Sequence, residues 1–192
     1  MRAMPARPRG EFPRLSAIVA VRDAEDTVGR DVRDLARHLR ERGLTFQILA
    51  IGDGSYDTSL TLLRFLAAEI PELSVLGAAR PGRAFRRAMA HAQGEAVLLW
   101  EANRPALPHA ILGWALSRLA RRDAVIVRDR FILAKRLRAL PILLNVNGRG
   151  DEYESRFERQ ASNMRLDLEI AGKRARRGPG GILAPVLRIL SV

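Results

Sequence analysis

The sequence predicts an α/β fold in which a mostly parallel β-sheet carries helices on both faces. Two observations lead to this prediction. Short apolar runs rich in β-branched residues alternate along the chain with longer segments whose apolar residues recur at helical spacing. The apolar runs are also uniform and bounded by charged or turn-forming residues, as strands buried on both faces are. Alternation of this kind is typical of parallel strands joined by helical crossovers.

The predicted elements follow one another in a regular order. Strands are expected at 14–21, 46–51, 73–77, 96–100 and 124–127. Helices are expected at 26–43, 59–70, 83–94 and 106–122. In the first of these helices Val28, Val32 and Leu35 share one face, and Gly43 stands where helices commonly end.

The pattern after residue 128 is less regular. We interpret 130–146 as a helix broken at Pro141, because a proline inside a helical pattern interrupts its hydrogen bonds. The residues at 147–164 read as a glycine-containing loop followed by an acid-rich helix, and 166–172 as an edge strand.

The chain length of 192 residues suits a single domain. We expect this domain at 14–172, after a disordered basic leader at 1–13. A basic hinge and an apolar tail then occupy 173–192. Such a tail can lie on an anionic membrane surface. It can also fold back over the domain or pair with a second copy in a homodimer, and this alternative is favoured.

The charge balance is strongly basic. The chain has 33 Lys and Arg against 21 Asp and Glu, a formal net charge of +12. Such a surplus indicates anionic partners: phosphorylated small molecules, nucleic acid or an acidic membrane face. Nucleic acid is disfavoured, because surfaces that bind single strands use aromatic side chains and aromatics are only 5% of this chain.

The cysteine count, the histidine spacing and the hydropathy exclude further classes of protein. The absence of cysteine excludes disulfides, thiolate catalysis and Cys-ligated zinc. His38, His91 and His109 fall in separate predicted helices without zinc-like spacing. No apolar run approaches the roughly 20 residues that cross a bilayer, and the leader lacks a hydrophobic signal region. We therefore expect a cytoplasmic protein, peripheral at the inner membrane face if the tail binds lipid.

Polar side chains follow three of the predicted strands. Arg22 and Asp23 come after the first, Asp53 after the second, and Glu101 and Asn103 after the fourth. Ligands of open α/β sheets bind beyond the carboxyl ends of the strands. The sequence therefore predicts a ligand site formed by these three polar groups.

Four segments, in order, resemble family 2 glycosyltransferases of the GT-A fold. SAIVAVRDAEDTV is similar to the family's first strand and loop, and FQILAIGDGSYDTS to its E-I-I-V-V-D-D-G-S-x-D-G-T segment. PGRAFRRAMAHAQGEAVLLWEAN parallels the helix and strand that end in D-x-D, and GDEYESRFERQASNMRLDLEIAGKRARRG the acceptor-side segment. The resemblance covers about 14–178. It is strongest to enzymes that make polyprenyl-phosphate sugars, such as dolichyl-phosphate mannose synthase.

The resemblance implies a GT-A fold and an inverting transfer from a nucleotide-diphospho-sugar, UDP- or GDP-linked. In the family, carboxylates at the first two strand ends hold the base and ribose, and the last acid of D-x-D holds Mg²⁺ or Mn²⁺. Carried across, nucleotide binding falls on Asp23, Glu25 and Asp53. Glu101 and Asn103 take the two acid positions of D-x-D, as catalytic and metal-binding residues.

Asn103 is the main departure from the family pattern. An amide oxygen can bind a hard cation but brings no charge to offset its dehydration. The departure predicts weak or no dependence on Mg²⁺ or Mn²⁺. Negative charge still develops on the leaving diphosphate, and a cation must meet it.

Two interpretations account for the departure. In the first, arginines replace the metal, because guanidinium groups match diphosphate oxygens; the candidates are Arg22, Arg80, Arg83 and Arg104. The alternative for these four arginines is a solvated basic rim. A lipid-phosphate acceptor is already ionised and needs no general base, so Asp151, Glu152 and Glu154 would position it or contribute only to solubility. In the second, the chain is a catalytically inactive glycosyltransferase-fold protein that acts as a binding, scaffold or regulatory module.

Overall fold

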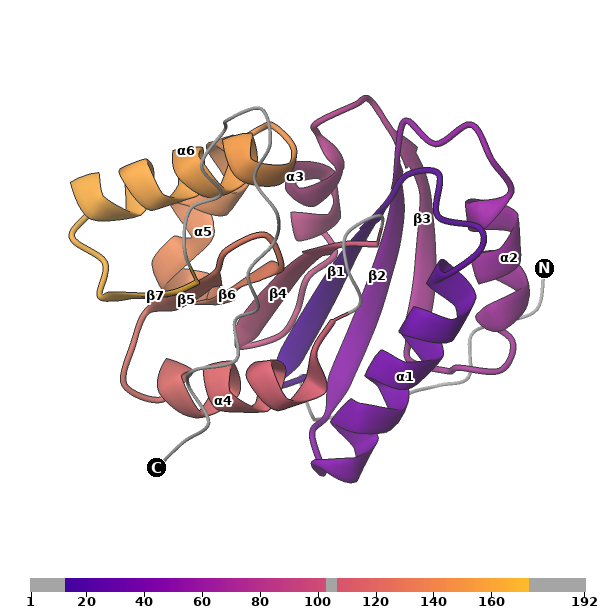
Figure 1. Ribbon diagram of the computed structural model, residues 1–192, viewed down its shortest axis with the longest axis horizontal. Coiled ribbons are helices and arrows are strands. Elements are labelled where there is room, and N and C mark those ends of the chain that lie inside the picture. The colour runs from indigo at the N-terminus through magenta and orange to yellow at the C-terminus, as the bar shows by residue number, and fades with distance from the viewer. Residues whose placement is uncertain (1–12, 103–106, 173–192) are drawn as a thin grey trace, which may run out of the picture.

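The computed structural model describes residues 13–102 and 107–172 (Figure 1). The described strands are β1 (Leu15–Val21), β2 (Phe46–Asp53), β3 (Leu73–Ala79), β4 (Ala96–Glu101), β5 (Ala124–Val127), β6 (Phe131–Lys135) and β7 (Leu168–Ala171). The described helices are α1 (Val28–Glu41), α2 (Ser59–Leu66), α3 (Ala84–Met89), α4 (His109–Leu119), α5 (Arg136–Asn145) and α6 (Gly150–Asn163). The predicted α/β fold is confirmed.

The strands form one sheet in the order β3-β2-β1-β4-β6-β5-β7. Only β6 runs antiparallel to its two neighbours, β4 and β5, while every other pairing is parallel. β1 lies between β2 and β4, so the last residues of these three strands meet at one end of the sheet. We call this the carboxyl end of the sheet. The edge position predicted for the last strand is confirmed by β7.

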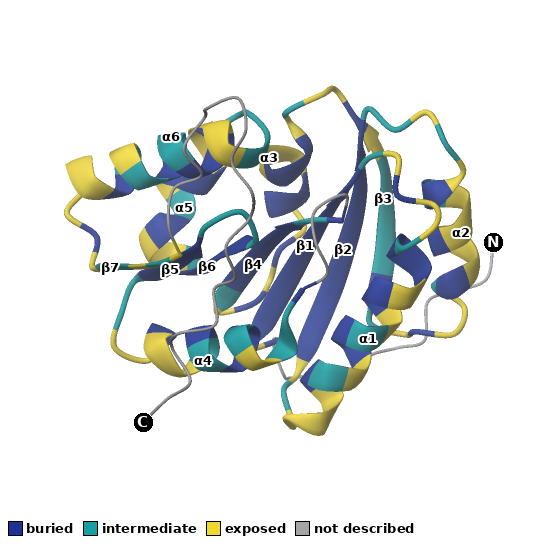
Figure 2. Ribbon diagram, viewed as in Figure 1, coloured by how far each residue is buried: buried dark blue, intermediate teal, exposed yellow. Residues whose placement is uncertain are grey.

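Two apolar cores lie on the two faces of the sheet. Successive side chains of a strand point to opposite faces. Val19 and Val21 accordingly pack in the core with α1, α2 and α4, whereas Ile18 and Ala20 pack in the core with α3, α5 and α6. Figure 2 shows the central strands buried between helices whose outer surfaces are exposed. The prediction of helices on both faces is confirmed.

The prediction of a helix over 130–146 is wrong in its first part. Phe131–Lys135 is the strand β6, which a three-residue turn after β5 brings back between β5 and β4. A run of four or five apolar residues suits a strand or a buried helix equally, and only pairing decides between them. The helix that follows is not broken at Pro141, which lies exposed inside α5. On an exposed side, the carbonyl without an N–H partner can be solvated.

No helix of the described residues is long and apolar enough to span a membrane. The expected tail at 173–192 and all but the last residue of the expected leader at 1–13 lie outside the described residues.

Gly94 and Gly29 give a matched test of the packing. A Cβ at Gly94 would lie 2.5 Å from the backbone nitrogen of Ser16 and 2.8 Å from the carbonyl oxygen of Ala96. Backbone atoms cannot move aside cheaply, so we expect Gly94→Ala to lower the free energy of unfolding by about 2–3 kcal/mol. A Cβ at Gly29, in α1, meets only side-chain atoms at 3.7 Å and beyond.

Gly29→Ala should therefore raise the free energy of unfolding by about 0.5–1 kcal/mol, since alanine loses less backbone entropy in a helix. Urea unfolding of both variants measures the difference. Equal stability of Gly94→Ala and the unchanged protein would contradict the packing described here.

Candidate nucleotide-binding site

The loops that follow β1 and β2 are joined by hydrogen bonds to Asp57. Its carboxylate accepts hydrogen bonds from the Glu25 N–H at 2.9 Å, the Ser55 hydroxyl at 2.7 Å, and the Ser59 N–H and hydroxyl at 3.1 and 2.7 Å. The Ser59 oxygen in turn accepts from the Ala24 N–H at 3.0 Å. Asp57 thus fixes the two loops against each other and accepts a hydrogen bond from the first N–H of α2.

Two of the predicted nucleotide-binding acids take part in this arrangement. Asp23, with φ of 46°, accepts a hydrogen bond from the Tyr56 N–H at 2.9 Å. Glu25 accepts from the N–H and hydroxyl of Thr58 at 3.0 and 2.6 Å. Both side chains are nevertheless exposed. The structure brings them together at the carboxyl end of the sheet, and their contact with a nucleotide stays a prediction.

The hydrogen bonds to Asp57 also set its pKa. Burial acts to raise the pKa of this carboxyl, but hydrogen bonds from Ser59, Ser55 and the Glu25 N–H outweigh it and lower the pKa from 3.8 to about 2. The carboxylate is therefore ionised throughout the neutral range. Hydrogen bonds to a charged acceptor are stronger than those to a neutral one.

Asp57→Asn should make the protein less stable in a manner that depends on pH. The folded-state pKa lies below the ordinary value, so the ionised group stabilises the fold above about pH 4, and this contribution is lost as the pH falls toward 2. We expect the variant to lose about 1–2 kcal/mol at pH 7. Urea unfolding at pH 7, 4 and 3 should show the difference shrinking with acidity.

Asp26→Asn is the control for this experiment, because Asp26 is an exposed acid of the same loop. It should leave stability nearly unchanged. A loss in Asp57→Asn that stayed constant between pH 7 and pH 3 would show that the charge of Asp57 is not what joins the loops.

Asp53, at the end of β2, is buried and has partners on two sides. Its Oδ1 accepts a hydrogen bond from the Gly82 N–H at 2.7 Å, and its Oδ2 accepts from Arg149 Nε at 2.5 Å. Arg149 Nη2 donates to the carbonyl oxygen of Asp53, also at 2.5 Å. The predicted nucleotide-binding acid is thus already in an ion pair. Sequence reasoning missed Arg149, and its position between Gly148 and Gly150 is the only local signal that marks it.

Glu101, at the end of β4, is half-buried beside the beginning of α6. Its Oε1 accepts a hydrogen bond from the Gly150 N–H at 2.7 Å. Tyr153 lies buried next to it, and burial together with the charge of Glu101 raises the pKa of the Tyr153 hydroxyl. Glu101, Tyr153 and Glu154 line a hollow of about 10 Å³, room for a single water molecule.

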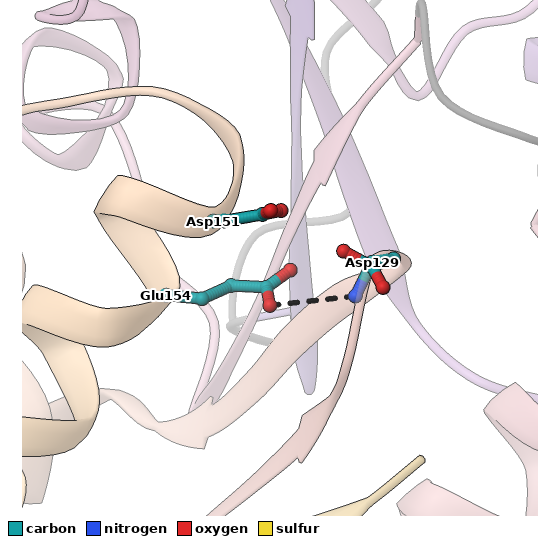
Figure 3. A group of neighbouring side chains, drawn as sticks. All are labelled: Asp129, Asp151 and Glu154. Carbon is teal, nitrogen blue, oxygen red and sulfur yellow. Dashed lines mark hydrogen bonds between the residues drawn. The ribbon is translucent and has the colours of Figure 1, made fainter. Parts of the chain in front are cut away.

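Three carboxylates gather where the β5–β6 turn meets α6. Figure 3 shows Asp129 on the turn and Asp151 and Glu154 on the helix. Oxygen atoms of the three lie within 4.8 Å of one another, and Glu154 accepts a hydrogen bond from the Asp129 N–H at 3.3 Å. Carboxylate oxygens are ligands that Mg²⁺ and related cations prefer. In the described part of the chain, this is the acidic group that could hold such a cation.

The remaining residues predicted from the sequence lie outside this group of three carboxylates. Glu152 is exposed and pairs with Arg156 of its own helix at 2.5 Å, away from the three carboxylates. Arg22 is half-buried and Arg80 and Arg83 are exposed. Among the described residues, none of these three arginines pairs with a carboxylate. The predicted Asn103 and Arg104 lie outside the described residues.

The fold is shared with solved structures of nucleotide-sugar enzymes. A mannosyltransferase from Pyrobaculum calidifontis in complex with GDP-mannose and Mn²⁺ matches with a TM-score of 0.67 and 15% identity, over 88% of this chain and 59% of that one. Glucosyl-3-phosphoglycerate synthase from Mycobacterium tuberculosis, with Mn²⁺ and UDP-glucose, gives a TM-score of 0.61 and 14% identity over 83% and 68% of the two chains.

A third similar structure is a 4-diphosphocytidyl-2C-methyl-D-erythritol synthase from Anaerococcus prevotii, with a TM-score of 0.60 and 12% identity over 82% of this chain and 86% of that one. No protein-family profile and no curated protein matches the sequence. At these identities the similarity establishes the fold, which is that of GT-A nucleotide-diphospho-sugar transferases. The chain spans about 59% of the length of the Pyrobaculum enzyme.

Proposed function

We propose that the protein binds a nucleotide-diphospho-sugar at the carboxyl end of its sheet and transfers the sugar to a phosphate or glycan acceptor. One observation carries the proposal. Acids follow β1, β2 and β4 at the place where α/β sheets bind their ligands. Arg22, Arg80 and Arg83, which pair with no acid among the described residues, follow β1 and β3 at the same end of the sheet. In the resembling family the same strand ends hold a sugar nucleotide.

The arginines support transfer with weak or no metal dependence. When the bond between the sugar and the diphosphate breaks, negative charge grows on the diphosphate and must be met by a cation. Arg22, Arg80 and Arg83 have no acid partner among the described residues, so their charge is available to an anion. Their guanidinium groups suit diphosphate oxygens better than a lysine would.

The residues at the expected metal position fit a divalent cation poorly. Glu101 already gives one oxygen to the Gly150 N–H, and position 103 is an amide. A cation bound there would be held by Glu101 and Asn103 and would polarise the diphosphate. The alternative ligands are Asp129, Asp151 and Glu154. Of these, Asp151 and Glu154 belong to the segment that resembles the acceptor side of the family. Asp151 is the acid we assign to positioning the acceptor.

A lipid-phosphate acceptor is consistent with the basic and apolar sequence of the tail. Such an acceptor would place the protein in the cytoplasm, peripherally at the inner membrane face. A glycan acceptor requires no membrane, and the tail would then fold back or pair with a second copy.

A second candidate function is a binding or regulatory module without catalysis. The observation that favours it is that Asp53 and Glu101 are both held by the chain itself, through Arg149 and Gly150. A site closed in this way would bind a nucleotide only if those contacts were exchanged for contacts with the ligand.

A thermal-shift panel separates these candidates. We expect UDP-glucose or GDP-mannose at millimolar concentration to raise the Tm by several degrees, because a ligand that binds only the folded state stabilises it. Mn²⁺ or Mg²⁺ should add little. Radiolabelled sugar transfer to a phosphate or glycan acceptor then distinguishes an enzyme from a binding module.

Arg80→Ala combined with Arg83→Ala should reduce that Tm shift, whereas Arg121→Ala should not. Arg121 is equally exposed but precedes β5, at the opposite end of the sheet. Absence of any shift across UDP-, GDP-, ADP-, CDP- and TDP-sugars would refute nucleotide binding.

Asn103→Asp tests the predicted reason for weak metal dependence. Restoring a second carboxylate should make nucleotide binding respond to Mn²⁺, because the added charge offsets dehydration of the ion. Calorimetric titration of UDP or GDP with and without Mn²⁺ measures the response. If Mn²⁺ strengthens binding no more in the variant than in the unchanged protein, position 103 is not the metal position.

A further inference from the structure

The segment 147–150, which ends at the first residue of α6, connects three loops at the carboxyl end of the sheet. The Gly148 N–H donates to the carbonyl oxygen of Gly82 at 2.9 Å, between β3 and α3. Arg149 contacts Asp53 at the end of β2, and Gly150 contacts Glu101 at the end of β4. We call these four residues the bridging segment.

The bridging segment depends on glycine at both sides of Arg149. Gly148 has φ of 129° and Gly150 has φ of 52°, conformations that residues with a Cβ rarely adopt. A Cβ on Gly54 would lie 3.2 Å from Arg149 Nη2, so the glycine after Asp53 leaves room for the guanidinium group. The backbone on both sides is thus shaped to hold this one arginine at Asp53.

The guanidinium group is held on one side and open on the other. Nε donates to the Asp53 carboxylate and Nη2 to its carbonyl oxygen, at 2.5 Å each. Nη1, which carries two N–H groups, makes no hydrogen bond within the described residues. The side chain is 32% exposed, against 8% for that of Asp53.

We propose that Arg149 binds the diphosphate of the nucleotide sugar, with Asp53 as the residue that positions it. This inference rests on the proposed function. An arginine fixed by an acid has already lost its rotamer freedom, so less entropy is lost when its free N–H groups bind phosphate oxygens. The guanidinium group stays charged at every relevant pH, and hydrogen bonds from it to phosphate are charge-assisted.

This role also accounts for the ion pair between Asp53 and Arg149. The Asp53 carboxylate compensates the positive charge of Arg149, and Arg80 and Arg83 supply the net positive charge that attracts the anion. Asp53 then acts through Arg149 and has no contact with the base. The carboxylate of Asp53 matches the family pattern, but here it would position Arg149 and would not hold the base.

Binding of inorganic pyrophosphate, UDP and GDP, measured by calorimetry at low ionic strength, tests the proposal. Arg149→Ala should weaken the binding of pyrophosphate by about tenfold or more, since a charge-assisted contact is lost. It should weaken to the same extent the binding of whichever nucleoside diphosphate, UDP or GDP, the unchanged protein binds. Arg149→Lys, which keeps the charge but not the planar fork, should lose less. The affinity for the matching nucleoside, uridine or guanosine, should not change.

Two further variants distinguish a loss of binding from a loss of folding. Arg149→Met with Asp53→Asn removes both charges, so no buried carboxylate is left without a partner, and it should bind pyrophosphate as weakly as Arg149→Ala. Arg159→Ala, an exposed arginine of α6, should bind like the unchanged protein. Thermal unfolding establishes that each variant is folded.

The inference is overturned if the folded Arg149 variants bind pyrophosphate and the nucleoside diphosphate as tightly as the unchanged protein, or more tightly. Arg149 would then serve only to hold the loops together. In that case the proposed function survives. If pyrophosphate binds through Arg149 but neither UDP nor GDP binds, the diphosphate-binding role of Arg149 stands, and its assignment to a nucleotide sugar fails together with the proposed function. Absence of all binding by the unchanged protein would overturn both.

Discussion

The parallel pairing of β1 with both β2 and β4 is the constraint on which the candidate site depends. It places Asp23, Asp53 and Glu101, which are far apart in the sequence, at one end of the sheet. Helical crossovers make this arrangement possible, because parallel strands cannot be joined by tight turns. The contacts of the bridging segment with Asp53 and Glu101 depend on that shared end.

The acids that meet beneath the loops require hydrogen-bond donors or cations as partners. Burying a carboxylate costs free energy unless it is hydrogen-bonded or paired with a cation. The structure meets this need in two ways. Hydroxyl and N–H groups surround Asp57, and one arginine from a distant segment holds Asp53. The same contacts join the loops, so the electrostatics of the site and its shape have a common origin.

The fold and the departures from the glycosyltransferase pattern lead to one view of the chemistry. Solved structures that share this fold hold GDP-mannose or UDP-glucose. Position 103 is an amide where the resembling family has an acid. Among the described residues, Arg22, Arg80 and Arg83 have no acid partner, and Arg149 is held by Asp53. Charge that a metal supplies in the resembling family is, in our proposal, supplied here by side chains.

The sequence by itself determined the alternation of strands and helices and which acids follow which strands, because periodicity and strand ends are local features. It did not determine that Phe131–Lys135 is a strand, since a short apolar run becomes one only by pairing with β4 and β5. Nor did it reveal Arg149, which lies 96 residues from Asp53. The partner of Glu101 is a backbone N–H, and a backbone donor cannot be identified from the side chains in the sequence. Only the tertiary structure decides such contacts, because they arise when distant segments meet.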